Sequence, residues 1–359
     1  MHTYNFSISL VLLTCSSLLS GCQSWYGPSA LTDTHPAYNQ AMVNSLSHEM
    51  LLNLVRLKYR DRAYFLKINS ITASMSLKSN LGIKGGEFVT PNAGVAFSQS
   101  PTISYAPLDG EDFLKSLLSP IPLDAVLIMA QSGWNTDFIF SLCIYRINDL
   151  KNAPHASGPT PLTKPKFQDF KKFIKSIHYL QNQGLIEIGV NIESDYKVSI
   201  QFMPTEDKQA LIEIQAIRDL LKLNNSNRYL FSTNLLYNNS KTWNLRVRSI
   251  SSIMYYLSQN IDIPVEHKQR GLVTNTVTKD GKFFDWGETP AGVLFKIHSS
   301  STKPDKTYLS VYYRDTWFYI ADNDLESKST FILLTQLFSL QAGQSTSVGP
   351  TLTIPVGNR

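Results

Sequence analysis

Two stretches in the first third of the chain alternate between apolar and polar residues. From residue 71 to residue 83, every odd-numbered residue except Ser79 is apolar, and every even-numbered one is polar or glycine. The alternation returns between residues 95 and 105. The apolar residues that define it are Ile71, Ala73, Met75, Leu77, Leu81, Ile83, Val95, Phe97, Ile103 and Tyr105. Because successive side chains of a β-strand lie on opposite faces, this pattern predicts two long strands, each with one apolar face.

The segment between the two stretches, Lys84 to Asn92, contains two glycines and a proline, which is typical of a turn. The strands and the turn together predict a β-hairpin. At about 3.3 Å per residue, the first strand would reach about 43 Å, well beyond the usual strand.

Elsewhere the spacing of apolar residues predicts both helices and short strands. We expect helices over 39–58, 111–118, 122–132, 136–148, 167–183, 205–221, 250–259 and 328–340. We expect strands over 185–190, 196–202, 229–232, 243–247, 293–297, 308–313, 317–320 and 352–356. The fold class is therefore α+β, with the long amphipathic β-hairpin and helices in the N-terminal half and a mixed α/β lobe in the C-terminal half.

Two segments rich in Pro, Gly, Ser and Thr predict the domain organisation. Residues 153–166 are expected to link residues 38–152, which hold the hairpin, to an α+β lobe over 167–359. Residues 22–37 are expected to form an irregular tether in front of the first helix.

The N-terminus carries an apolar run, Ile8 to Leu19, that is too short to span a membrane but fits the core of a secretory signal. The residues Leu19, Ser20, Gly21 and Cys22 follow, and they resemble the lipobox of bacterial lipoprotein precursors. The resemblance implies that residues 1–21 are a removed signal peptide and that Cys22, the first mature residue, carries the lipid. Gln23 stands where an Asp would retain the protein in the inner membrane, which implies the outer membrane and its periplasmic face.

Three longer blocks, 51–66, 117–135 and 317–343, resemble a group of uncharacterised bacterial outer-membrane-type lipoproteins. They read LLNLVRLKYRDRAYFL, LLSPIPLDAVLIMAQSGWN and WFYIADNDLESKSTFILLTQLFSLQAG. That resemblance supports the membrane address and implies no activity.

Composition excludes several classes of site. With Cys15 in the signal and Cys22 acylated, only Cys143 of the three cysteines remains, so neither an intramolecular disulfide nor a cysteine-type zinc site can form. We expect Cys143 to be a small core residue. The net charge of +5 is spread along the chain without a nucleic-acid signature. Motifs for serine hydrolases, metalloproteases and nucleotide binding are missing, so we predict no catalytic residue, metal or cofactor.

Three other motifs were considered as sites. The acidic run Asp322, Asn323, Asp324 and Glu326 lacks the glycine of a calcium loop, so we interpret it as the start of a helix. Ser300 and Lys303 match S-x-x-K in a polar, turn-like segment that does not suit a catalytic serine. The aromatic residues Trp286, Tyr313, Trp317 and Tyr319 are candidates for the floor of a ligand groove, although alternation should bury about half of this aromatic hairpin.

These observations favour a non-enzymatic lipoprotein of the envelope with a structural, assembly or partner-binding role. Its expected partners are the membrane, through the lipid, and other envelope proteins. Two alternatives stay open. The 71–105 hairpin could lie on the helices at 111–148, or several copies could insert their hairpins into the outer membrane as a transport pore. An envelope glycan hydrolase would require paired carboxylates in one cleft.

We predict that Cys22→Ser releases the protein from the membrane fraction, because stable anchoring takes more than one acyl chain at about 0.8 kcal/mol per buried CH₂ group. Cell fractionation measures this. Cys15→Ser is the matched control, since Cys15 leaves with the signal. A Cys22→Ser protein that still sediments with membranes would show that lipid does not hold it there.

Overall fold

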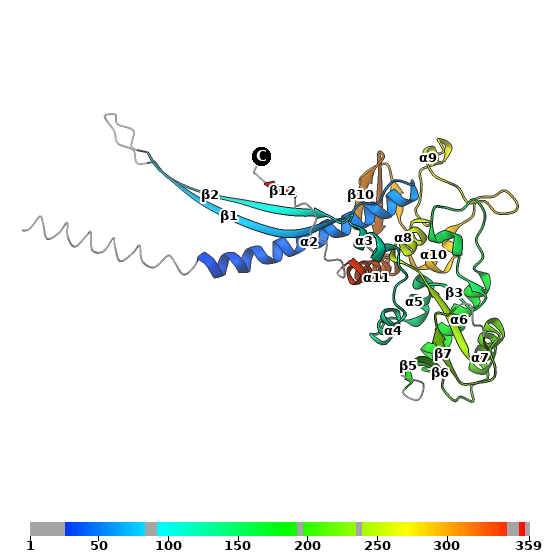
Figure 1. Cartoon of the computed structure of the whole chain (residues 1–359). Helices are drawn as coiled ribbons and strands as arrows, with labels where there is room; N and C mark the ends of the chain where they lie inside the picture. The colour runs from blue at the N-terminus through cyan, green and yellow to red at the C-terminus, as the bar shows by residue number, and fades with distance from the viewer. Residues whose placement is uncertain (1–25, 83–91, 192–196, 235–238, 343–351, 356–359) are drawn as a thin grey trace, which may run out of the picture. The chain divides into compact units, whose positions relative to one another are not determined.

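The computed structural model describes residues 26–82, 92–191, 197–234, 239–342 and 352–355 (Figure 1). The chain forms two compact units, Met1–Glu49 and Met50–Arg359. The predicted signal peptide and Cys22 lie outside the described residues.

The boundary between the units falls within the first described helix, α2 (Tyr26–Lys58). The sequence predicted a helix from Asn39 and an irregular tether before it; the structure corrects this, because α2 is helical from Tyr26. Pro28 lies in the first turn, where the backbone N–H that proline lacks has no helical partner. Pro36 lies inside the helix and removes one backbone hydrogen bond there.

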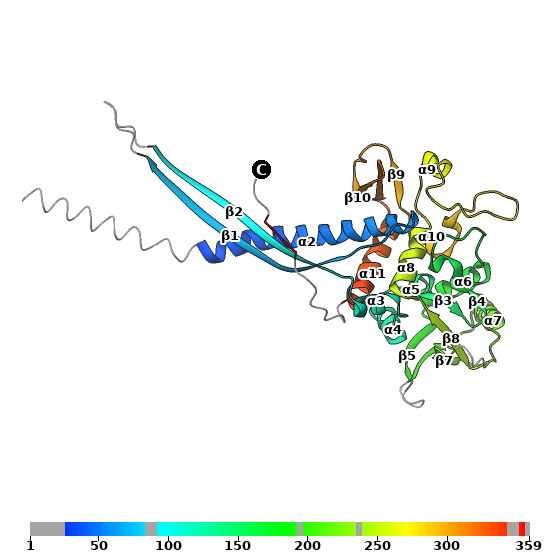
Figure 2. The ribbon, with the colours of Figure 1, turned by 45° about the horizontal axis from the view of Figure 1, so that its top comes forward.

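The second unit contains a six-stranded sheet in the order β4-β3-β8-β7-β6-β5. Its strands are β3 (Ile144–Ile147), β4 (Leu150–Lys151), β5 (Ile186–Asn191), β6 (Lys197–Phe202), β7 (Arg228–Ser232) and β8 (Thr242–Val247). All neighbours are antiparallel except β7 and β8, which are parallel. The helices α6 (Gln168–Asn182) and α7 (Lys208–Leu221) contact each other beside this sheet (Figures 1 and 2).

This sheet corrects two expectations. The helix predicted over 136–148 ends early, because α5 is Thr136–Cys143 and the chain continues into β3. A short apolar run has no periodicity that separates a buried helix from a buried strand. Since β3 pairs with β8, strands from both sides of the predicted linker share one sheet.

The segment 153–166 is accordingly packed inside the second unit and does not separate two domains. It contains the short 3₁₀ helix η1 (Pro154–Ser157), and Ala153, Ala156 and Thr160 are buried. The Ala153 N–H donates to the carbonyl of Lys166 at 3.0 Å. The composition that indicated a linker therefore produces a close-packed irregular segment.

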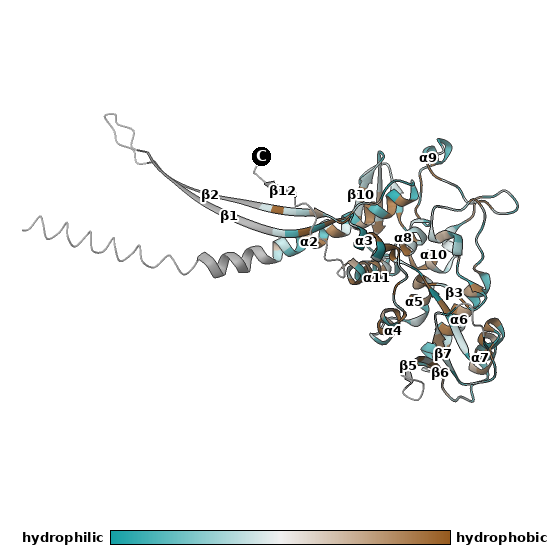
Figure 3. Ribbon diagram, in the orientation of Figure 1, coloured by the Kyte–Doolittle hydropathy of each residue, from teal (hydrophilic) through white to brown (hydrophobic). Residues whose placement is uncertain are grey.

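The remaining helices surround a common apolar core. They are α3 (Glu111–Leu118), α4 (Leu123–Gln131), α8 (Ile250–Ser258), α9 (Val265–Gln269), α10 (Pro290–Leu294) and α11 (Leu325–Ala342), with the 3₁₀ helix η3 (Trp286–Glu288). Apolar residues, drawn brown in Figure 3, recur along α5 and α8, which carry many of the buried side chains. Cys143 is fully buried, as expected, and burial raises the pKa of its thiol to about 12.

A three-stranded antiparallel sheet, in the order β10-β11-β9, lies near the C-terminus of the second unit. Its strands are β9 (His298–Ser300), β10 (Thr307–Tyr313) and β11 (Thr316–Ala321), and the predicted hairpin of β10 and β11 is confirmed. The strand predicted over 293–297 is wrong, because Pro290 begins α10, where its fixed φ suits a helix. A third sheet, β1-β2-β12, holds the long hairpin: β1 (Leu66–Gly82), β2 (Asn92–Pro107) and β12 (Leu352–Pro355). The fold is α+β.

We predict that Gly292→Ala destabilises the protein by about 1–3 kcal/mol, the usual range for overpacking. A Cβ on Gly292 would lie 1.9 Å from the carbonyl oxygen of Trp286, so α10 and η3 would have to separate. Urea unfolding measures the change. Gly158→Ala is the control, since nothing lies within 4 Å of its Cβ position, and it should change stability by less than about 0.5 kcal/mol. Equal stability of both variants would contradict the close approach.

Candidate functional site

The long hairpin predicted from the alternation is confirmed by the pairing of β1 with β2. The ladder runs from Leu66 opposite Pro107 to Gly82 opposite Asn92, with one register shift between Ile68 and Ser70. Figures 1 and 2 show the two strands side by side along their length. The 17 residues of β1 correspond to about 56 Å at about 3.3 Å per residue.

The register places the alternating pattern of β1 opposite the alternating pattern of β2. Beyond the shift, odd-numbered positions of β1 lie opposite odd-numbered positions of β2, as in Ile71 with Ile103 and Leu77 with Phe97. Directly opposite positions share a face of an antiparallel ladder. The apolar positions of both strands therefore share one face, and Ser, Thr, Asn and Gly positions dominate the other. Ile83 lies outside the described residues.

The edges of this hairpin are largely unpaired within the described part of the chain. The strand order β1-β2-β12 leaves the outer edge of β1 without a neighbour. On the other side, β12 pairs with β2 only from Thr102 to Tyr105. Among the described strands, none pairs with the outer edge of β1 over residues 67–82 or with that of β2 over residues 92–101, so these stretches can accept a further strand.

The base of the hairpin shows which face the protein itself covers. Ser104 and Ala106 are buried, at 9% and 4% exposed, whereas Ile103 and Tyr105 are only partly buried. The expectation that the odd-numbered apolar face lies on the helices is thus not met at the base, where the even-numbered side is the more covered.

The connection from α2 into β1 is held by a buried side chain. Asn53, which is fully buried, donates through Nδ2 to the Tyr64 carbonyl at 2.7 Å and accepts from the Tyr64 N–H at 3.0 Å. Next along the chain, the Phe65 ring packs against Phe338, with centroids 4.6 Å apart, and against Phe113 at 6.0 Å. The start of β1 is therefore tied to the core by hydrogen bonds and by aromatic packing.

A polar cluster reinforces the same connection. Asp61 accepts hydrogen bonds from the Tyr313 hydroxyl and, at 2.9 Å, from the Arg314 guanidinium. Partial burial acts to raise the pKa of Asp61, but these two hydrogen bonds outweigh it and hold the pKa below its ordinary value. Burial and then Asp61 raise the pKa of Tyr313. The Arg314 guanidinium also lies 5.2 Å from the centre of the Tyr59 ring.

The four aromatic residues predicted as a ligand floor do not form one surface. Trp317 and Tyr319 alternate with buried Phe318 and Ile320 on β11, so they share its partly exposed face. Tyr313 lies opposite Thr316, on the face that carries Phe318, and is therefore on the other side of the sheet. The ring of Trp317 packs on Tyr312 at 5.2 Å, and Tyr319 stacks on His298 at 5.3 Å.

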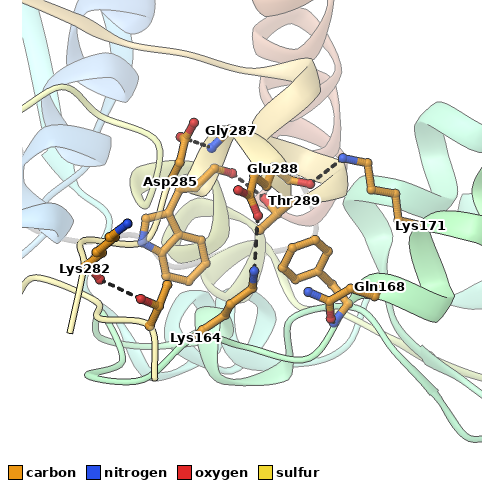
Figure 4. Close-up of polar contacts among 11 residues, drawn as sticks. Lys164, Gln168, Lys171, Lys282, Asp285, Gly287, Glu288 and Thr289 are labelled. Atoms are coloured by element: carbon orange, nitrogen blue, oxygen red, sulfur yellow. Dashed lines mark hydrogen bonds and ion pairs between the residues drawn. The ribbon is translucent and has the colours of Figure 1, made fainter. Parts of the chain in front are cut away.

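Trp286 lies apart from this sheet, buried in η3 and packed on Phe284 with centroids 5.3 Å apart. Figure 4 shows how η3 is held: the Lys171 ammonium donates to the Glu288 carbonyl at 2.7 Å, and the Lys164 ammonium lies 3.3 Å from the Glu288 carboxylate. The Asp285 carboxylate accepts from the Gly287 N–H at 2.8 Å. These contacts fix the position of η3, and Trp286 forms part of the wall of a separate cavity.

The other motifs have structural roles. Asp324 accepts hydrogen bonds from the N–H and hydroxyl of Ser327 at 3.0 and 2.6 Å, so the acidic run begins α11 as expected. Ser300 accepts from the Thr302 N–H at 3.2 Å, and the Lys303 ammonium lies 5.5 Å from the centre of the Trp317 ring. Among the described residues, no three His, Cys, Asp or Glu side chains lie close enough together to hold a metal ion.

Comparisons with models of protein families, with characterised proteins and with solved structures find no match for this chain. Within the described part of the chain, no helix combines the length and apolar character that a membrane span requires.

We predict that Asp61→Asn lowers the free energy of unfolding by about 0.5–1 kcal/mol at pH 7. The expected change is small because the Asp61 side chain is 37% exposed and solvent screens its charge. The pKa of Asp61 in the folded protein is lowered from its ordinary value of 3.8, so this contribution is present above about pH 4 and is lost as the pH falls through the folded value. Urea unfolding at pH 7 and pH 3 measures it. Asp109→Asn, an exposed control, should match the wild type at both pH values. A difference that does not shrink in acid would contradict the assignment.

Proposed function

We propose that this chain is a lipid-anchored, non-enzymatic component of the bacterial envelope that assembles with further copies of itself through the β1–β2 hairpin. The observation that carries the proposal is a two-stranded ribbon of 17 and 16 residues whose edges are open over most of their length. The anchor at Cys22 comes from the lipobox and would hold the copies on one membrane surface.

A ribbon of this kind needs a partner. A two-stranded hairpin is at best marginally stable in water, and three or more strands or a packed helix are required. Open edge strands are also templates for pairing, and proteins usually protect them with charges, prolines or bulges. Protection by charge is sparse: Lys67 and Lys78 are the only charged residues of β1, and β2 carries none. Pro101 interrupts the edge of β2 at one position, and the register shift between Ile68 and Ser70 lies near the base of β1.

A second copy of the chain suits both edges at once. In a ring, the β1 edge of one copy lies beside the β2 edge of the next, and the strands alternate in direction. A single strand from another protein would cover one edge and leave the other open. In a ring, each copy pairs its β1 edge with one neighbour and its β2 edge with the other, so a closed ring has no open strand edge.

The faces of the hairpin favour a second role for the same assembly, insertion into the outer membrane as a pore component. A membrane-spanning strand needs about 9–11 residues, with apolar positions toward lipid and polar positions away from it. Both strands exceed that length, and their apolar positions share one face. A closed ring also satisfies the requirement that no backbone edge be exposed to lipid.

The described part of the chain does not favour the hydrolase alternative. Two carboxylates, Asp262 and Asp285, do line one cavity, but its volume of about 160 Å³ is small for a glycan chain. Asp262 lies 3.5 Å from the Lys296 ammonium and 3.4 Å from His298, and Asp285 is bound to the Gly287 N–H.

We predict that the lipidated, detergent-extracted protein has the mass of several copies by light scattering with detergent correction. Leu77→Asp should reduce it to a monomer, because it places a charge on the apolar face. Ser76→Asp, the neighbouring position on the polar face, is the matched control and should keep the assembly. A shortened variant, in which an Asn-Gly turn joins Thr72 directly to Thr102, should be monomeric and folded.

A monomeric wild type would overturn assembly between copies, and an equal effect of both Asp variants would contradict the role of the apolar face. Conductance in planar bilayers separates the two roles. Single-channel steps from the wild type and the Ser76→Asp variant, absent with Leu77→Asp, would support the pore. A wild type that forms multi-copy assemblies but shows no conductance would support assembly between copies and exclude the pore.

A further inference from the structure

A cavity of about 160 Å³ lies in the second unit between the end of α2, the segment after α8 and the loop before η3. It is independent of the hairpin. Its wall includes buried Lys58 and Gln259, partly exposed Lys268 and Asn275, and exposed Phe283, so it runs from the core to the surface. The volume suits a small molecule or ion.

Lys58 is the unusual member of this wall. The side chain is only 6% exposed, and its ammonium donates to the Gln259 carbonyl at 3.1 Å. None of the ion pairs in the described part of the chain includes Lys58. Burial, and then the neighbouring Lys268, lower the pKa of Lys58 from 10.5 to about 7. A buried lysine nearly always forms an ion pair with a carboxylate. Lys58 forms none among the described residues and lies beside a second lysine, so its surroundings favour the binding of an anion.

Gln259 provides a second, independent observation. It is 2% exposed, and its amide nitrogen donates to the Tyr255 carbonyl at 2.9 Å and to the Gly158 carbonyl at 3.4 Å. Its Oε1 atom is buried without a hydrogen-bond partner in the described structure. A buried acceptor without a donor costs about 1–3 kcal/mol, so Gln259, like Lys58, is a costly polar residue in the wall of this cavity.

We propose that this cavity binds a small oxyanion, with Lys58 and Lys268 contacting the anionic oxygens. Inorganic phosphate has this chemistry. The cavity's two carboxylates are already engaged: Asp262 with Lys296 and His298, and Asp285 with the Gly287 N–H. The neighbouring His267 is bound through Nδ1 to the Tyr59 hydroxyl at 2.7 Å.

Binding should be coupled to protonation of Lys58. At pH 8 most of a lysine with a pKa of about 7 is neutral, and a bound anion favours its charged form. The protein should therefore take up close to one proton for each anion bound at pH 8, and much less at pH 6, where Lys58 is already charged. A lysine with a purely structural role would not produce this exchange.

Titration calorimetry of the full mature chain with inorganic phosphate, in buffers of different ionisation enthalpy, measures both the affinity and the proton uptake. Lys58→Met should weaken binding at least tenfold and abolish the uptake. Lys268→Met, at the partly exposed side of the cavity, should weaken binding about three- to tenfold. It should reduce the uptake only in part, because loss of the Lys268 charge raises the pKa of Lys58 while burial still lowers it. This variant tests the site even if Lys58→Met does not fold. Lys175→Met, exposed on α6 and away from the cavity, is the matched control and should bind within twofold of the wild type.

Two results would overturn the proposal. One is no phosphate binding to the wild type at pH 8. The other is binding whose affinity and proton uptake are the same in Lys268→Met as in the wild type. Failure of the hairpin variants to alter assembly would leave this test unaffected, because the cavity and the hairpin share no residue.

Discussion

The packing of the second unit depends on one buried charge that has no carboxylate partner in the described part of the chain. Arg248, at the start of α8, is 1% exposed, and its guanidinium donates to the Asn152 carbonyl and to the Ser157 hydroxyl. The guanidinium also lies 4.2 Å from the centre of the Tyr256 ring. Burial lowers its pKa to about 10, which still leaves the charge in place at neutral pH. A buried donor left without its hydrogen-bond partner costs about 1–3 kcal/mol, and more when it is charged, so these contacts hold the segments together.

The backbone of the same residue joins two more segments. Its N–H donates to the Cys143 carbonyl at 2.7 Å, and its carbonyl accepts from the Ile121 N–H at 3.1 Å. Arg248 therefore links the end of α5, the turn after α3 and the irregular segment 152–157. Because Arg248 lies after the predicted linker and its partners lie before or within it, the hydrogen bonds explain why the linker does not separate domains. Composition alone gave the opposite prediction, since Pro and Gly mark irregular backbone but do not tell whether it is exposed or packed.

Sequence patterns predicted the elements whose signal is local and missed those that depend on distant partners. The hairpin of β1 and β2 could be predicted because a long alternation has one interpretation. The strand β3 could not be predicted, because it forms by pairing with β8, which lies about a hundred residues later in the chain. Lys58 had a signal that was overlooked: it follows Leu54 by four positions, on the apolar stripe of a helix. No local pattern, however, places Gln259 or Lys268 beside it.

The hairpin and the cavity break the same rule, that each level of a structure should agree with the others. In the described part of the chain, the outer edges of β1 and β2 have no neighbouring strand over most of their length, Lys58 is buried without an ion pair, and Gln259 Oε1 is buried without a hydrogen-bond partner. Replacing buried charges by apolar side chains often stabilises a protein, so stability alone gives no reason for a lysine at position 58. Each departure costs free energy in the isolated chain, and in our proposals each is offset by something that binds: strands of neighbouring copies for the edges, and an oxyanion for the lysines. Because the two costs arise in regions that share no residue, the two proposals can succeed or fail separately.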